Sequence, residues 1–160
     1  MVIKHAFRKD IAALTAVETA CFPPAEAATE KEFIDRVQYY GNHFWLLYEG
    51  DKLLAFVDGF VTDEPDLTDV MYEDAALHNE QGAWQMIFGV DTAPAYRHHG
   101  YASTLMRRVI DDARAAGRAG LVLTCKDRLI GFYARFGYQD EGVSESTHGN
   151  VVWHQMRLRF

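Results

Sequence analysis

Residues 84–106, WQMIFGVDTAPAYRHHGYASTLM, decide how this chain folds. The stretch begins as a buried strand, passes through a short loop that contains Pro94, and enters a helix through residues 97–102. The first backbone N–H groups of a helix have no partners within the helix, and the helix dipole adds positive charge there. Gly100 lets the backbone approach a ligand closely, and Ala102 adds little bulk. The stretch therefore predicts an anion site for a phosphate-bearing ligand.

Two common phosphate-binding motifs do not fit this loop. A dinucleotide fingerprint needs two more glycines, and a P-loop needs a lysine that is absent here. The pattern that is present is R-x-x-G-x-A, formed by Arg97, Gly100 and Ala102. It resembles the pyrophosphate loop of the GNAT superfamily of N-acetyltransferases, whose pattern is [QR]-x-x-G-x-[GA].

A second stretch, residues 121–138, LVLTCKDRLIGFYARFGY, carries the same resemblance. Its end, residues 132–138, is similar to the signature that closes the acetyl-CoA site in that superfamily. The whole stretch resembles the arylalkylamine (serotonin-type) N-acetyltransferases, and residues 21–28 and 149–153 resemble their bacterial members. The resemblance covers essentially the whole chain and implies acetyl-CoA as the co-substrate.

Length and composition indicate one globular domain over residues 1–160, with 49% hydrophobic and 24% charged residues. The net charge of −7 argues against a nucleic-acid partner and against an anionic membrane surface. No stretch has the length of a membrane span, and the first residues lack the apolar region of a leader. We therefore expect a cytoplasmic protein that binds an anionic cofactor and a cationic substrate.

The cysteines and histidines do not form a disulfide framework or a zinc site. Cys21 and Cys125 are too few and too far apart in sequence, so we expect free thiols. His98 and His99 are adjacent, and the remaining histidines are scattered without zinc-ligand spacing. We expect no metal.

Hydrophobic periodicity and turn residues predict an alternating order of strands and helices. Asp10 is expected to cap the first helix, Thr29 and Glu32 form a capping box for the second, and Asp127 is expected to cap the last. The acidic segment 63–82 has no firm assignment beyond a short helix near 70–77. The predicted strands are 2–7, 44–48, 53–61, one from 84, 121–125, 138–143 and 151–160, and the predicted helices are 11–21, 30–40, 101–116 and 129–136. This order predicts an α/β protein, and with the resemblance a GNAT fold: a single mixed, mostly antiparallel sheet with helices on both faces.

Acetyl transfer to an amine needs a held thioester, donors for the oxyanion, a base for the amine and a proton for the leaving thiolate. The resemblance implies that the backbone of Val90, Asp91 and Thr92 binds the pantetheine like an added strand. It also implies that the loop wraps the pyrophosphate through Arg97, His98, His99, Gly100, Tyr101, Ala102 and Ser103.

Tyr133 is the predicted general acid. In the family the matching tyrosine hydroxyl lies beside the thioester sulfur, and a tyrosine pKa of about 10 suits protonation of a thiolate. The spacing alone favours a Tyr133 that only packs beside Phe132 and Phe136 in the core, and the motif is what favours catalysis.

The general base stays open. The animal serotonin-type enzymes carry histidines on the strand before the loop, where this chain has Met86 and Phe88. The candidates are Glu26, in the loop that covers the amine site in the family, Asp91, His148, or a chain of water molecules.

Histidines beside a diphosphate would hold their protons more tightly, so we hypothesise that CoA affinity weakens above neutral pH. The alternative is that His98 and His99 contribute only backbone N–H groups.

The acceptor is expected to be a small primary amine, either an arylalkylamine or a polyamine. A protein N-terminus or lysine, and a non-catalytic acyl-CoA-binding module, are the alternatives. The protein is expected to be a monomer or a homodimer. Its aromatic residues either line an amine pocket or fill the core: Phe22, Trp45, Tyr72, Trp84 and Trp153.

Overall fold

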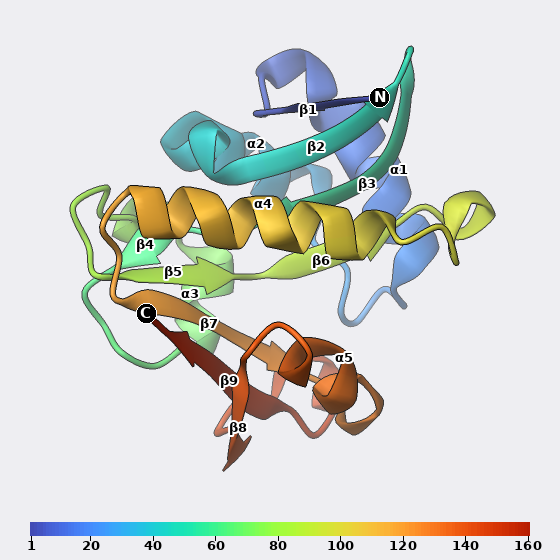
Figure 1. The fold of residues 1–160 in the computed structure, drawn as a ribbon. Coiled ribbons are helices and arrows are strands. Elements are labelled where there is room, and N and C mark those ends of the chain that lie inside the picture. The colour runs from blue at the N-terminus through green and yellow to red at the C-terminus, as the bar shows by residue number, and fades with distance from the viewer. The chain divides into compact units, whose positions relative to one another are not determined.

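The computed structural model describes all 160 residues, 1–160. By its internal contacts the chain divides into two compact units, the first made of residues 1–59 and 89–109 and the second of residues 60–88 and 110–160. Each unit contains one hydrogen-bonded sheet, with four strands in the first and five in the second (Figure 1). The expectation of a single domain over 1–160 stays a prediction.

The first unit is an antiparallel sheet with the strand order β1-β2-β3-β6. Helices α1 and α2 contact its strands through side chains such as Leu14 and Phe33, both fully buried. Phe33 meets the rings of Phe44 and Phe56 edge to face, at centroid distances of 6.3 and 5.9 Å. The elements are β1 Val2–Lys4, α1 Ile11–Cys21, α2 Glu30–Tyr40, β2 Phe44–Glu49, β3 Lys52–Asp58 and β6 Gly89–Thr92.

Local signals in this unit are confirmed with one exception. The capping box forms, because Thr29 Oγ1 accepts the Glu32 N–H at 3.2 Å and Glu32 Oε1 accepts the Thr29 N–H at 3.1 Å. The prediction that Asp10 caps α1 is wrong. Its carboxylate instead accepts the N–H of Phe7 at 2.8 Å and pairs with Lys4, since a 3-10 turn over Arg8–Asp10 precedes the helix.

The second unit is a mixed sheet with the order β4-β5-β7-β9-β8, in which only β5 and β7 are parallel. Helix α4, Tyr101–Ala115, begins in the first unit and ends in the second. No helix of the chain has both the length and the apolarity needed to cross a bilayer. The other elements are β4 Val61–Thr62, α3 Asp69–Glu73, β5 Trp84–Ile87, β7 Gly120–Cys125, α5 Ile130–Ala134, β8 Gln139–Val143 and β9 His154–Arg159.

The α/β class and the mostly antiparallel pairing are confirmed, but the hydrogen-bonded ladder is not continuous. The predicted strand 53–61 is two strands in different sheets, and so is the strand that begins at Trp84. The second break falls at Phe88, whose ring packs against Phe60 and Tyr72 at 5.0 and 4.9 Å. We attribute the break to the packing of this half-buried ring, which takes one residue out of the pleat.

The last predicted helix is shorter than expected. Residues 127–129 form a 3-10 turn and α5 covers only 130–134. Asp127 does not cap it, because its carboxylate pairs with His154 Nε2 at 2.7 Å.

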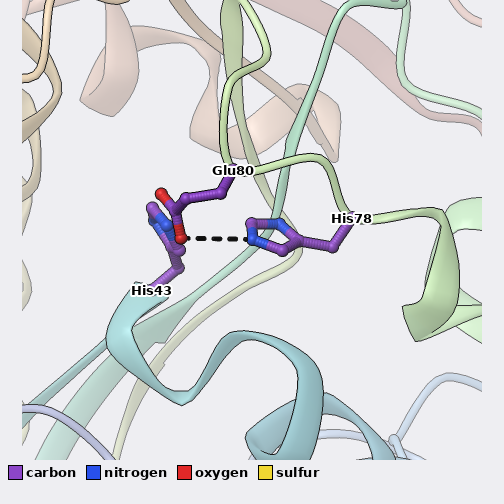
Figure 2. A group of neighbouring side chains, drawn as sticks. All are labelled: His43, His78 and Glu80. Carbon is purple, nitrogen blue, oxygen red and sulfur yellow. Dashed lines mark hydrogen bonds and ion pairs between the residues drawn. The ribbon is translucent and has the colours of Figure 1, made fainter.

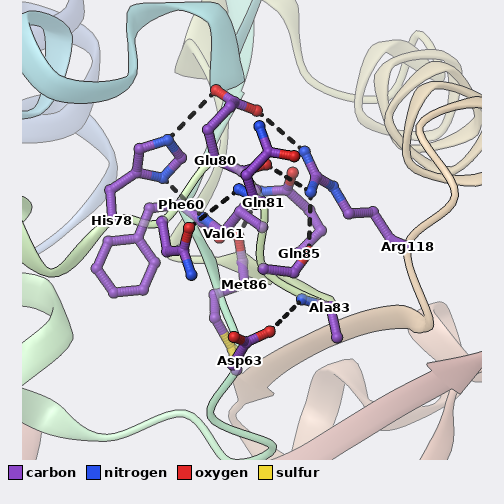
Figure 3. A network of polar contacts seen from close by, with 12 residues as sticks. Phe60, Val61, Asp63, His78, Glu80, Gln81, Ala83, Gln85, Met86 and Arg118 are labelled. Atoms are coloured by element: carbon purple, nitrogen blue, oxygen red, sulfur yellow. Dashed lines mark hydrogen bonds and ion pairs between the residues drawn. The ribbon is translucent and has the colours of Figure 1, made fainter.

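The segment 63–82, which the sequence did not assign, is held within the second unit by polar contacts (Figure 3). His78 Nδ1 accepts the Val61 N–H at 3.0 Å, and its Nε2 lies 3.4 Å from Glu80 Oε1 (Figure 2). Arg118 donates to the Glu80 carboxylate at 3.0 Å and to the carbonyls of Glu80 and Gly82 at 2.7 and 2.8 Å. One arginine therefore fixes both the side chain and the backbone of this segment.

Candidate active site

Strand β6 is the open edge of the sheet in the first unit. Ala93 N–H donates to Leu54 O at 2.9 Å, which directs the backbone of β6 at this point toward β3. Backbone groups alternate along a strand, so Asp91 also faces β3, whereas those of Val90 and Thr92 point away from β3. The Thr92 carbonyl accepts a hydrogen bond from Cys21 Sγ of α1 at 3.2 Å, so Val90 and the Thr92 N–H are the groups left for a ligand. An extended polar chain such as pantetheine is able to pair there as an added strand.

The loop that follows β6 has the backbone geometry of an anion site. His98 and Gly100 both adopt positive φ, 69° and 77°, immediately before α4 begins at Tyr101. A side chain at Gly100 would meet nothing within 4 Å, so the space beside it is open. The side chains of residues 97–99 are exposed. Left-handed residues before a helix of 15 residues orient several N–H groups to one side, which suits a diphosphate.

The two loop histidines are held differently. His99 Nδ1 lies 2.8 Å from Arg97 O and 3.1 Å from Tyr96 O, so it carries the hydrogen that it donates to these carbonyls. Its ring stacks on Tyr101 at 5.4 Å. His98 has a left-handed backbone conformation, with φ of 69°. His99 therefore shapes the loop, while the His98 side chain is exposed to solvent.

The other candidate residues of the first unit are buried. Asp91 is 1% exposed and Glu26 is 9% exposed. Burial raises the pKa of Asp91 well above its ordinary value, and the neighbouring Glu18 carboxyl group raises it further. The sequence did not single out Glu18 or Asp58, which join Asp91 beneath α1. The spacing of Glu18, four residues after Leu14 and three before Cys21, already placed it on the apolar face of that helix.

Tyr133 lies in α5 of the second unit and is 6% exposed. Its ring meets Phe132 at 5.1 Å and Tyr138 at 5.8 Å, both edge to face. The neighbouring rings of Phe132 and Tyr138 therefore limit the rotation of the Tyr133 ring.

Cys125 ends strand β7 and is 2% exposed. Burial, together with the charges of Asp140 and Asp127, raises the pKa of its thiol to about 11. A thiol with this pKa is a poor nucleophile at neutral pH, as expected for a free buried cysteine.

Four half-buried aromatic rings form a cluster in the second unit: Tyr72, Phe88, His148 and Trp153. His148 stacks on Tyr72 at 5.2 Å with an interplanar angle of 8°, and Tyr72 meets Phe88 at 4.9 Å. Trp153 Nε1 donates to His148 O at 2.8 Å. We call this group the aromatic cluster. Of the aromatic residues named from sequence, it gathers Tyr72 and Trp153, whereas Trp45 is 2% exposed in β2 and Trp84 lies under Arg157.

The loop that carries His148 is tied to α3. The Asp69 carboxylate accepts hydrogen bonds from Ser146 Oγ and, at 3.0 Å, from the Thr147 N–H. Tyr72 of the same helix reaches Thr124 Oγ1 at 3.1 Å. These contacts hold His148 within the aromatic cluster.

The predicted site residues therefore lie in two groups. Val90–Ser103 and Glu26 belong to the first unit, and Tyr133 and His148 belong to the second. Phe88, which the sequence placed only at a position where relatives carry a histidine, is part of the aromatic cluster.

Comparison with known proteins agrees with the motifs. The chain is 29% identical over 113 residues to the serotonin N-acetyltransferase of Mesocricetus auratus, which covers 69% of this chain and 52% of that protein. The chain thus spans about half the length of this curated relative.

Solved structures show the same fold. The GphF GNAT-like decarboxylase in complex with isobutyryl-CoA superposes with a TM-score of 0.86, at 22% identity over 99% of both chains. The ribosomal-protein-S18-alanine N-acetyltransferase from Escherichia coli superposes with a TM-score of 0.72, at 19% identity over 99% of this chain and 92% of that chain. The profile of the acetyltransferase (GNAT) family matches residues 11–138, from the start of α1 to the end of the Tyr133 motif. This chain therefore belongs to the GNAT family of acetyltransferases.

Proposed function

We propose that this protein is an N-acetyltransferase that transfers the acetyl group of acetyl-CoA to the primary amine of a small arylalkylamine. The observation that carries the choice of acceptor is the half-buried aromatic cluster around Tyr72 and His148. Aromatic rings that are ordered but still partly exposed offer stacking partners to an aryl group and a favourable face to an ammonium. The resemblance to a serotonin N-acetyltransferase supports the same class.

Acetyl-CoA is the proposed co-substrate. The open edge of β6, residues 90–92, supplies backbone groups for the pantetheine through Val90 and Thr92, and the loop Arg97–Ser103 supplies N–H groups for the pyrophosphate. The fold is shared with a protein whose structure contains isobutyryl-CoA.

Transfer requires the neutral amine nitrogen to attack the thioester carbon. The tetrahedral intermediate then collapses to the amide and CoA thiolate, with one proton leaving the nitrogen and one reaching the sulfur. We assign the second proton to the Tyr133 hydroxyl. For the first, the place of His148 in the aromatic cluster favours it over Glu26 and over Asp91, which is 1% exposed and whose pKa burial raises well above its ordinary value.

A polyamine is the second candidate acceptor. The second unit has a pocket of about 490 Å³ whose lining includes Asp66, Asp69, Glu141 and Glu145. Arg157 already pairs with Asp66 and Glu141, at 2.8 and 3.0 Å, which lowers the negative charge left for a ligand. The aromatic cluster therefore remains the stronger indication.

Thiol release from acetyl-CoA, measured against tryptamine, phenethylamine, spermidine and an alanine-initiated peptide, tests this function. We expect turnover with the two arylalkylamines, and we expect Trp153→Leu to raise their KM about tenfold while the KM for acetyl-CoA is unchanged. Tyr39→Leu, an exposed aromatic residue of α2, is the matched control. Turnover with the peptide or spermidine alone would move the acceptor to those classes. CoA binding without any turnover would indicate a non-catalytic module.

The loop histidines give a separate prediction for CoA binding. If their imidazoles contact the diphosphate, we expect Kd for CoA to rise between about pH 6 and 8.5. We expect the His98→Gln, His99→Gln double variant to show a flatter dependence, measured by calorimetric titration with CoA. Parallel curves would mean that the two residues act only through their backbone N–H groups.

A further inference from the structure

Three carboxyl groups and one guanidinium, contributed by α1, α2, β3 and β6, are buried in the first unit. Glu18, Asp58, Asp91 and Arg36 are 7, 1, 1 and 4% exposed. The three acids approach Gly89, where a Cβ atom would lie 2.8 Å from Asp58 Oδ1, 3.2 Å from Asp91 Oδ1 and 3.8 Å from Glu18 Oε1. The acids, from α1, β3 and β6, therefore converge on one point that only a glycine leaves open.

The hydrogen-bond donors in this group are unequally distributed. Asp58 Oδ2 accepts from Arg36 Nη1 at 3.1 Å, and Glu18 Oε2 accepts the backbone N–H of Ala28 at 2.8 Å. Neither oxygen of Asp91 receives a hydrogen bond from a protein donor. A fully buried carboxylate without any donor is strongly unfavourable, whereas one added proton makes it a donor to a neighbouring carboxylate.

We propose that Asp91 and Glu18 share one proton, and that this pair is a latch that holds residues 22–29, between α1 and α2, to strand β6. Glu18 is the central member, since its Oε2 accepts the Ala28 N–H while its Oε1, like Asp91 Oδ1, lies beside Gly89. Both act as positioning residues. The latch joins the strand proposed to bind pantetheine to the segment that contains Glu26.

The surroundings of the pair support protonation. Burial raises the pKa of Asp91 well above its ordinary value, and the neighbouring Glu18 carboxyl group, Cys21 and Asp58 raise it further. Burial likewise raises the pKa of Asp58 to about 7, although Arg36 lowers it. The groups that face the pair are Glu18 and Cys21 from α1, Arg36 from α2 and Asp58 from β3. One guanidinium is too little to balance three carboxylates.

The latch has a defined pH dependence. An unfolded aspartate ionises near about pH 4, whereas folded Asp91 keeps its proton to a much higher pH. The stability that the shared proton contributes is therefore complete below about pH 4 and is lost as the pH rises through the raised pKa of Asp91. Alkaline conditions leave two adjacent buried charges and weaken the hold on Ala28.

The test compares the pH dependence of thermal unfolding in wild type, Asp91→Asn and Asp51→Asn. We expect the wild-type Tm to fall through Asp91 alone by about 3–5 °C for each pH unit above about pH 5, for as long as the folded protein keeps the Asp91 proton. The amide introduced by Asp91→Asn donates to Glu18 without ionising, so the slope in this variant is flatter by that amount. Asp51, in the exposed hairpin turn, is the control, and its variant is expected to follow wild type. If the Tm of wild type and of Asp91→Asn depends on pH in the same way, the proposal that Asp91 and Glu18 share a proton is wrong.

Two further measurements keep the proposal testable if Asp91→Asn does not fold. Glu18→Gln also supplies an amide donor to Asp91 and is expected to flatten the slope in the same way. Hydrogen exchange at the Ala28 amide reports the latch directly. We expect its protection factor to fall at least about tenfold between about pH 6 and 9 in wild type and to stay constant in the amide variants. Constant protection in wild type would exclude the latch.

The effect on catalysis rests on the proposed function. If residues 22–29 cover the amine, the KM of the amine rises at alkaline pH more in wild type than in Asp91→Asn. A change in Ala28 protection without this difference in KM would leave the latch in place and remove the segment from the amine site. Unfolding and exchange are measured without substrate, so they do not depend on the acetyl-transfer assignment.

Discussion

Replacing Tyr133 by phenylalanine is expected to lower kcat for amine acetylation by about 100-fold or more, the range expected when a general acid is removed. The ring packing against Phe132 and Tyr138 does not need the hydroxyl, so the variant should fold normally. The KM for acetyl-CoA should change little, because the loss falls on the leaving thiolate and not on binding. Steady-state thiol release at saturating acetyl-CoA measures the effect.

Tyr138→Phe is the matched control for this change. Tyr138 is 3% exposed, lies in the same unit and packs edge to face on Tyr133. Burial holds its pKa well above the ordinary value, so its hydroxyl is a weak proton donor. We expect its variant to keep kcat within about twofold. An unchanged kcat in Tyr133→Phe, with a folded protein and normal CoA binding, would remove Tyr133 from the mechanism.

Replacing Arg36 by methionine is expected to lower the free energy of unfolding by about 3–5 kcal/mol at about pH 7.5, the cost of leaving a buried charge without its partner. Arg36 is 4% exposed, donates to Asp58 Oδ2 at 3.1 Å, and also interacts with the charge of Glu18. Its loss also removes the interaction that lowers the pKa of Asp58. Asp58 should then keep its proton to higher pH, and the variant should be least stable under alkaline conditions. Urea unfolding at several pH values measures both effects.

The double variant Arg36→Met, Asp58→Leu separates the unpaired charge from the loss of packing. A buried ion pair replaced by apolar residues of similar size is often tolerated, so we expect the double variant to recover most of the stability lost in the single one. A double variant no more stable than Arg36→Met would show that the guanidinium acts mainly by filling space.

The sequence alone determined the features whose cause is local. The capping box of Thr29 and Glu32 and the turn from strand to helix before Tyr101 depend on residues that are near each other along the chain. The order of motifs around Gly100 and Tyr133 was equally readable, and it led to the family that the comparisons support.

The tertiary structure decided where strands break and which buried groups meet. The residues around Ile87 do not show whether the strand that begins at Trp84 ends there or continues to Thr92. The rings that pack on Phe88 at the break belong to Phe60 and Tyr72, which are distant in sequence. The aromatic cluster likewise joins segments separated by many residues.

The same limit applies to the acids beneath α1. Glu18, Asp58 and Asp91 are far apart in sequence, and nothing along the chain indicates that the three carboxyl groups meet. Packing of α1 over β3 and β6 removes all three from water and brings them together beside Gly89. The protonation of such a group depends on desolvation and on neighbouring charge, and both arise only when the chain has folded.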